Sequence, residues 1–202
     1  MEKPIIVVKI LSRPSTIPLI IANILPLLGV IFLDWDLFQI LFLYWLECGV
    51  IGFYNIFKLI KVSGLLSILL VPFFIVHYGG FMAGHLIFIF AFFAPDLASS
   101  SFFPPRETIT SLLGTVAIPL ATLFISHGIS FFHNFIGKGE YKRTDAGKQM
   151  QEPYRRVVLM HVTLIFGGWI VLLLNTPVFA LALLVILKTI ADLHSHVNEH
   201  PS

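Results

Sequence analysis

The sequence has little charge and almost no cysteine, and both shortages narrow the class of protein. Asp, Glu, Lys and Arg make up 12% of the 202 residues, while 57% are hydrophobic. A soluble domain typically has about 25% charged residues. Cys48 is the single cysteine, so an internal disulfide is excluded. This composition is that of an integral membrane protein.

The sequence also lacks the local motifs of common enzyme classes. It has no HExxH, no CxxC, no phosphate-binding glycine loop with a lysine and no GxSxG nucleophile elbow. Nucleic-acid binding has no support beyond one modestly basic loop. Because no polar or Gly/Ser-rich linker separates two hydrophobic blocks, we expect a single domain over residues 1–202.

Long apolar stretches predict an all-α bundle of six transmembrane helices, since a helix needs about 20 largely apolar residues to cross a bilayer. The predicted spans cover approximately residues 14–33, 37–60, 65–94, 107–136, 155–174 and 177–196. Six spans place both termini on one side of the membrane. Of the 13 basic residues, all except Arg106 then fall on that side. The positive-inside rule therefore predicts a multi-pass protein of the cell (inner) membrane with cytoplasmic N- and C-termini.

The main cytoplasmic loop, "GKGEYKRTDAGKQMQEPYRR" at residues 137–156, is the most polar part of the chain. We interpret it as a topology anchor, and its basic residues would also attract anionic lipid. The expected partner of the whole chain is the lipid bilayer. A homo-oligomer is compatible with the sequence, which does not determine the oligomeric state.

Ionisable and amide side chains recur inside the apolar stretches, where they are costly and by default mark a functional site. In chain order they are Glu47, Asn55, His77, His85, His127, His133, Asn134, His161, Asp192 and His194. With a rise of about 1.5 Å per residue, we place Glu47, His77 and His127 about 15 to 20 Å from the cytoplasmic end of their spans. Several helices therefore offer polar groups to the interior of one bundle.

The first interpretation of this set is an intramembrane metal site. Imidazoles with a carboxylate suit zinc or iron, and a catalytic zinc takes three protein ligands and keeps one position open for water. We expect His77, His127 and His161 as ligands, with Asp192 or Glu47 as fourth ligand or general base. Such a site would support hydrolytic or redox chemistry on a membrane-soluble small molecule, with Glu47 as the catalytic residue. The sequence does not decide whether the protein is an enzyme.

Other interpretations use the same residues. Two histidines from different helices could hold haem b in an electron-transfer protein, with Gly79, Gly80 and Gly84 giving room for the macrocycle. A proton-coupled channel or transporter could use Glu47, His77 and His127 in sequence. Single buried His and Asn side chains, such as His85, also serve as interhelical hydrogen bonds. The GxxxG spacing of Gly80 and Gly84 favours close helix approach.

Five stretches carry a resemblance to a known family. They are "YWLECGVIGFYNIFKLIK", "HYGGFMAGHLIF", "SHGISFFHNFIGKGEYKR", "PYRRVVLMHVTLIFGG" and "LLVILKTIADLHSH". Through them the chain, from about residue 40 to 196, resembles a family of small prokaryotic polytopic membrane proteins classified as a domain of unknown function. The resemblance implies a six-helix membrane bundle and supplies no activity, substrate or cofactor.

Overall fold

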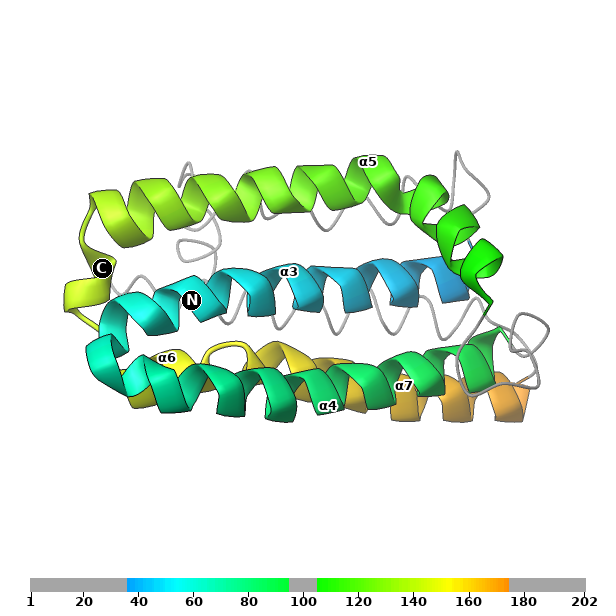
Figure 1. Cartoon of the computed structure of the whole chain (residues 1–202). Coiled ribbons are helices and arrows are strands. Elements are labelled where there is room, and N and C mark those ends of the chain that lie inside the picture. Colours follow the sequence, from blue (N-terminus) through cyan, green and yellow to red (C-terminus); the bar gives the residue numbers. More distant parts are fainter. Residues whose placement is uncertain (1–35, 95–104, 175–202) are drawn as a thin grey trace, which may run out of the picture. The chain divides into compact units, whose positions relative to one another are not determined.

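The computed structural model describes residues 36–94 and 105–174, and this part of the chain contains helices and no strand (Figure 1). The all-α class is therefore confirmed there. The chain divides into two compact units, Phe38–Leu164 on the one hand and Met1–Leu37 with Ile165–Ser202 on the other. The predicted spans 14–33 and 177–196 lie outside the described residues. The single domain expected over residues 1–202 stays a prediction.

Helices α3 (Leu37–Ser63) and α4 (Ser67–Phe93) form a hairpin. The 3-10 turn η1 (Gly64–Leu66) joins them, and Gly64 has a φ of 54°, a left-handed conformation that favours glycine. The Tyr78 hydroxyl donates to the Cys48 carbonyl at 2.8 Å, and the Trp45 indole donates to the Met82 carbonyl at 2.7 Å. The second bond joins residues that are farther from the turn on both helices than those of the first bond, so the two helices run antiparallel.

The remaining helices follow the expected positions within a few residues. Helix α5 (Arg106–Ser130) continues as the π-helix η3 (Phe131–Gly137), where 107–136 was predicted. The 3-10 turn η4 (Glu140–Lys142) and the short helix α6 (Ala146–Gln151) come next. Helix α7 (Tyr154–Leu174) then covers the predicted span 155–174. The charged loop thus contains structure of its own, which the sequence analysis did not predict.

Within Phe38–Leu164, α3 is the inner helix. Leu41, Cys48 and Leu59 are at most 1% exposed. The Tyr54 hydroxyl of α3 donates to the Phe124 carbonyl of α5 at 3.0 Å, while other α3 residues bond to α4 and α7. Helix α3 therefore lies between α5 and the pair α4 and α7, as Figure 1 shows for this unit.

Two glycines allow close packing around α3. A Cβ atom at Gly52 would lie 2.5 Å from the Tyr78 ring, and one at Gly128 would lie 2.7 Å from the Tyr54 hydroxyl. At Gly80 and Gly84 the same Cβ would meet no atom within 4 Å. The close helix approach expected from the GxxxG spacing is therefore not found at these two glycines in the described part of the chain.

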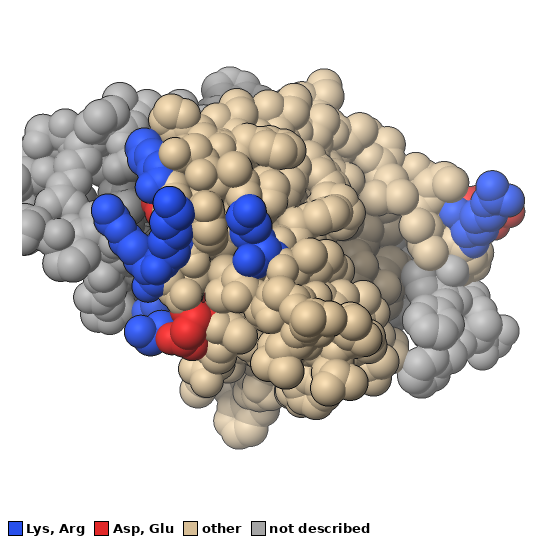
Figure 2. Space-filling view, turned by 60° about the vertical axis from the view of Figure 1, so that its left-hand side comes forward, with Lys and Arg blue, Asp and Glu red and all other residues tan. Residues whose placement is uncertain are grey.

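Among the described residues, two helical stretches, Leu37–Phe93 and Arg106–Gly137, are long and apolar enough to cross a membrane, by length and composition. Large apolar side chains on them are exposed, such as Val76 at 76% and Ile118 at 82%. On the face drawn in Figure 2, Lys and Arg gather at one end, a small charged group lies opposite, and the surface between them is uncharged. This distribution is typical of helices that pass through lipid.

Candidate functional site

His85 and His161 form a pair between α4 and α7. Nε2 of His85 lies 3.0 Å from Nδ1 of His161, which is hydrogen-bonding distance. His85 is buried, with 5% of its surface exposed, whereas His161 is exposed. The buried Nδ1 atom of His85 has no hydrogen-bond partner among the described residues. An unsatisfied buried polar atom is costly, and in a native structure it requires an explanation.

Glu47 and Arg156 form an ion pair between α3 and α7. The Arg156 Nη1 atom donates to Oε1 of Glu47 at 2.9 Å, and the glutamate side chain is only 8% exposed. The Tyr44 hydroxyl donates to the Arg156 carbonyl at 3.4 Å. Half-buried His127 of α5 experiences the charges of both Glu47 and Arg156. Glu47 is therefore buried as predicted, and its negative charge is balanced by an arginine.

His77 pairs with Tyr154 at the start of α7. The Nδ1 atom of His77 lies 2.7 Å from the Tyr154 hydroxyl. The His77 ring stacks on Phe73, with ring centroids 5.3 Å apart, and meets the edge of Phe81 at 5.2 Å. The imidazole is exposed, so this predicted ligand lies among aromatic rings at the surface of the described part of the chain.

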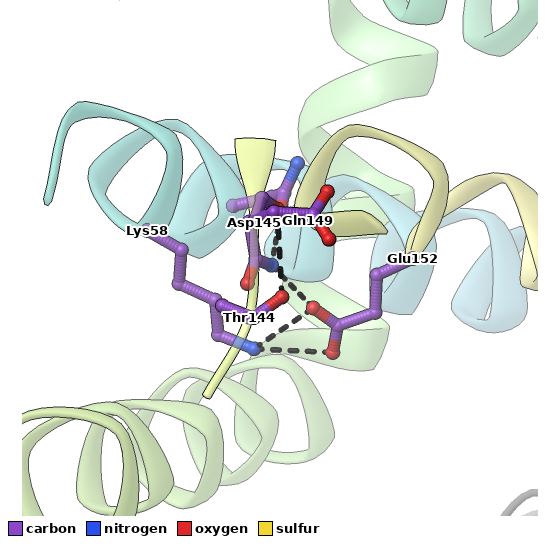
Figure 3. A network of polar contacts seen from close by, with 6 residues as sticks. Lys58, Thr144, Asp145, Gln149 and Glu152 are labelled. Carbon is purple, nitrogen blue, oxygen red and sulfur yellow. Dashed lines mark hydrogen bonds and ion pairs between the residues drawn. The ribbon is translucent and has the colours of Figure 1, made fainter. Parts of the chain in front are cut away.

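Asn55 belongs to a network that ties α6 to α3. The Gln149 Nε2 atom donates to the Asn55 Oδ1 atom at 2.7 Å, and both residues are buried. Figure 3 shows Gln149 also contacting Glu152, whose carboxylate binds Lys58 at 3.2 Å. Asp145 caps α6 by accepting a hydrogen bond from the Lys148 backbone N–H. This bond holds the pKa of the Asp145 carboxyl below its ordinary value.

The other predicted site residues lie apart from these pairs or outside the described residues. His133 and Asn134 lie in the π-helix η3, with His133 exposed. Asp192 and His194 fall outside the described residues. Within residues 36–94 and 105–174, no three His, Cys, Asp or Glu side chains form a group that could hold a metal ion. The predicted ligands His77, His127 and His161 are therefore not brought together there.

One continuous segment, residues 149–161, supplies partners to polar groups on α3 and α4. In chain order the pairs are Gln149 with Asn55, Glu152 with Lys58, Tyr154 with His77, Arg156 with Glu47, and His161 with His85. Sequence reasoning identified His161 and counted the other four members of this segment with the loop, although Arg156 also falls within the predicted span 155–174. A search for a cation to offset Glu47 would have pointed to Arg156, in the first turn of the fifth span.

Over residues 36–94 and 105–174, these observations define an all-helical protein with helices of membrane-spanning length and hydrogen-bonded polar pairs between them. The chain belongs to a family of unknown function (DUF6498), whose model matches residues 9–202. The family resemblance found in the sequence is thereby confirmed, while the prokaryotic and polytopic character of the family stays a prediction. Comparison with curated proteins and with solved structures gives no match.

Proposed function

We propose that the protein is an integral membrane protein with six spans and cytoplasmic termini. Support comes from the exposed apolar surface of α4 and α5 and from the gathering of Lys and Arg at one end of these helices (Figure 2). The first and sixth spans rest on the sequence alone. In a Cys48→Ala background, a membrane-impermeant maleimide added outside intact cells should label Arg106→Cys and leave Lys138→Cys unlabelled. The reverse pattern would contradict the orientation.

The function we infer is binding of a transition metal ion, zinc or iron, with His85 and His161 as two of its ligands. The observation that carries this proposal is the 3.0 Å distance between the two imidazole nitrogens. Two nitrogens bound at about 2.0–2.1 Å to one ion lie about 2.8–3.4 Å apart for ligand angles between about 90° and the tetrahedral angle. The same distance also fits a direct hydrogen bond, so the metal has to be measured.

The proposed ligand set differs from the one expected from the sequence. His161 is kept, and His85 replaces His77, because His77 pairs with the Tyr154 hydroxyl. Glu47 is left out because Arg156 balances its charge. A zinc site needs at least three protein ligands, so the proposal requires a further one. Asp192 and His194, the other residues predicted for this role, lie outside the described residues.

Haem b is less well supported by this geometry. Two axial imidazoles bind the iron from opposite faces of the macrocycle, which separates their nitrogens by about 4 Å with the ring between them. His85 and His161 are in direct contact, so they would have to move apart to hold a haem. If the bound metal supports catalysis, a membrane-soluble small molecule is the substrate class we propose, because the site would lie between apolar helices.

Elemental analysis tests the proposal. The full chain is purified in mild detergent without a metal-affinity step, together with His85→Ala, His161→Ala and the control His133→Ala, which removes an exposed imidazole on η3. We expect about one zinc or iron per chain in the wild type and in the control, and a loss in both pair variants. Metal-free wild-type protein, or metal retained in both pair variants, would overturn the proposal.

A proton pathway is the second candidate, favoured by a specific observation. Two hydrogen-bonded pairs of titratable groups bridge the same two helices, His77 with Tyr154 and His85 with His161. His77 and His85 are eight residues apart, or about 12 Å along α4. Proton flux in liposomes that is lost in His85→Ala, from protein that contains no metal, would favour this function over metal binding.

A further inference from the structure

The charged end of the described helices carries a basic cluster around Tyr141, made of Lys61, Lys142 and Arg143. The Lys61 Nζ atom lies 4.8 Å from the centroid of the Tyr141 ring, and the Lys142 Nζ atom lies 5.8 Å from it. An ammonium group at this distance is attracted to the aromatic ring. Tyr141 is thus in contact with two cations from different elements, α3 and η4.

The positive charge of this cluster is not balanced within the described part of the chain. Of the acidic residues at this end, Asp145 and Glu152 are engaged by Lys148 at 3.6 Å and by Lys58 at 3.2 Å. Glu140 of η4 supplies one further negative charge, against the three positive charges of the cluster. Lys61, Lys142 and Arg143 form no ion pair with any described residue, and all three are exposed. The cluster therefore offers several cations to an anionic partner.

Exposed apolar side chains lie next to these cations. The turn η1, which follows Lys61 within three residues, exposes Leu65 at 87% and Leu66 at 54%, and Ile68 just after it is 68% exposed. A turn in water typically contains polar residues and Gly, Pro, Asn or Asp. An apolar turn beside basic side chains fits the boundary between lipid tails and headgroups, where lysines extend their charge toward the phosphates.

We propose that Lys61, Lys142 and Arg143 form a binding site for the phosphate headgroup of an anionic phospholipid, whose acyl chains lie along Leu65 and Leu66. The cluster supplies charge to the phosphate, and the exposed turn supplies an apolar surface to the chains. This inference is independent of the metal site, because it uses none of the residues of the His85 and His161 pair.

Lipid titration of the full chain in mild detergent, followed by native mass spectrometry, tests the inference. The probes are phosphatidylglycerol and the zwitterionic phosphatidylcholine with the same acyl chains. We expect phosphatidylglycerol to bind more tightly, and Lys142→Gln to weaken its binding about fivefold, since one basic residue near an anionic surface contributes on that scale. The double variant Lys61→Gln/Lys142→Gln should lose about 25-fold.

Matched variants identify the cause of a lower lipid affinity in the lysine variants. Arg106→Gln removes one exposed charge at the start of α5, away from the cluster, and should leave the affinity unchanged. Lys142→Arg should keep tight binding, which separates loss of charge from misfolding. Equal affinity for the two lipids, or an equal loss in Arg106→Gln, would overturn the inference. Equally effective competition by inorganic phosphate would show a phosphate site without lipid recognition and would also overturn it.

Discussion

Replacement of Arg156 by glutamine should destabilise the protein strongly at neutral pH and much less in mild acid. Arg156 is 30% exposed, but the side chain of its ion-pair partner Glu47 is only 8% exposed, so the carboxylate has little access to water. Removal of one member of a buried ion pair typically costs about 3–5 kcal/mol, because the other charge is left buried.

Protonation sets an upper limit on this cost. A glutamate with the ordinary pKa of about 4.3 can be neutralised at a cost of about 3.7 kcal/mol at pH 7 and about 1.6 kcal/mol at pH 5.5. Arg156→Gln should therefore lose up to about 3.7 kcal/mol of unfolding free energy at pH 7 and about 2 kcal/mol less than that at pH 5.5. The double variant Glu47→Gln/Arg156→Gln has no charge to neutralise, so its stability should vary little between the two pH values.

The assay is reversible unfolding in mixtures of mild detergent and SDS, followed by far-UV circular dichroism at pH 7 and pH 5.5. Lys58→Gln is the matched control, because it also removes the basic member of an ion pair with a glutamate. Its ion pair with Glu152 is 24% and 45% exposed, so the expected loss is about 0–1 kcal/mol. The reasoning is refuted if Arg156→Gln costs no more than this control at pH 7, or if its cost is the same at both pH values.

Two further predictions concern packing and capping. Gly52→Ala should lower the unfolding free energy by about 1–3 kcal/mol, because its Cβ would lie 2.5 Å from the ring of Tyr78, whose hydroxyl is hydrogen-bonded to the Cys48 carbonyl. In contrast, the Cβ of Gly80→Ala would face open space, so this variant should not destabilise the protein. Equal unfolding midpoints for these two variants would contradict the packing. The depressed pKa of Asp145 means that its contribution to the α6 cap is complete above the ordinary value of 3.8 and is lost as the pH falls through the lower folded value. The amide protection factor of Lys148 should therefore fall between pH 6 and about pH 2.5 in the wild type, and a pH-independent factor would contradict this assignment.

The helices could be predicted from the sequence because each corresponds to one continuous stretch of apolar residues. Apolar stretches bounded by charges, Gly and Pro gave 65–94 and 155–174, and the structure has α4 at Ser67–Phe93 and α7 at Tyr154–Leu174. The small helix α6 was missed because its six residues carry no apolar run, and its cap, Asp145, was counted only as a loop charge.

The pairing of the polar residues could not be predicted in the same way. A helix turns by about 100° per residue, which places His77 and His85 about 80° apart around α4. The sequence pattern does not show that His85 is buried and His77 exposed. Nothing in that pattern says that α7 is the neighbour of α4, or that Tyr154 and His161, seven residues apart on one face of α7, are the respective partners. The choice of His77, His127 and His161 as ligands assumed a common centre, and the described structure distributes these residues over separate pairs.

The five polar pairs of the segment 149–161 together determine how this segment lies against α3 and α4. Each pair links a different residue of the segment to a different level of the α3 and α4 hairpin, from Asn55 with Gln149 to His85 with His161. A shift of α7 by one residue would rotate it by about 100° and would separate its three paired residues, Tyr154, Arg156 and His161, from their partners at once. Apolar packing alone distinguishes such registers poorly in lipid, because the alternatives bury similar apolar surface. These polar pairs therefore give α7 one defined position, and that position is what places the His161 imidazole 3.0 Å from His85.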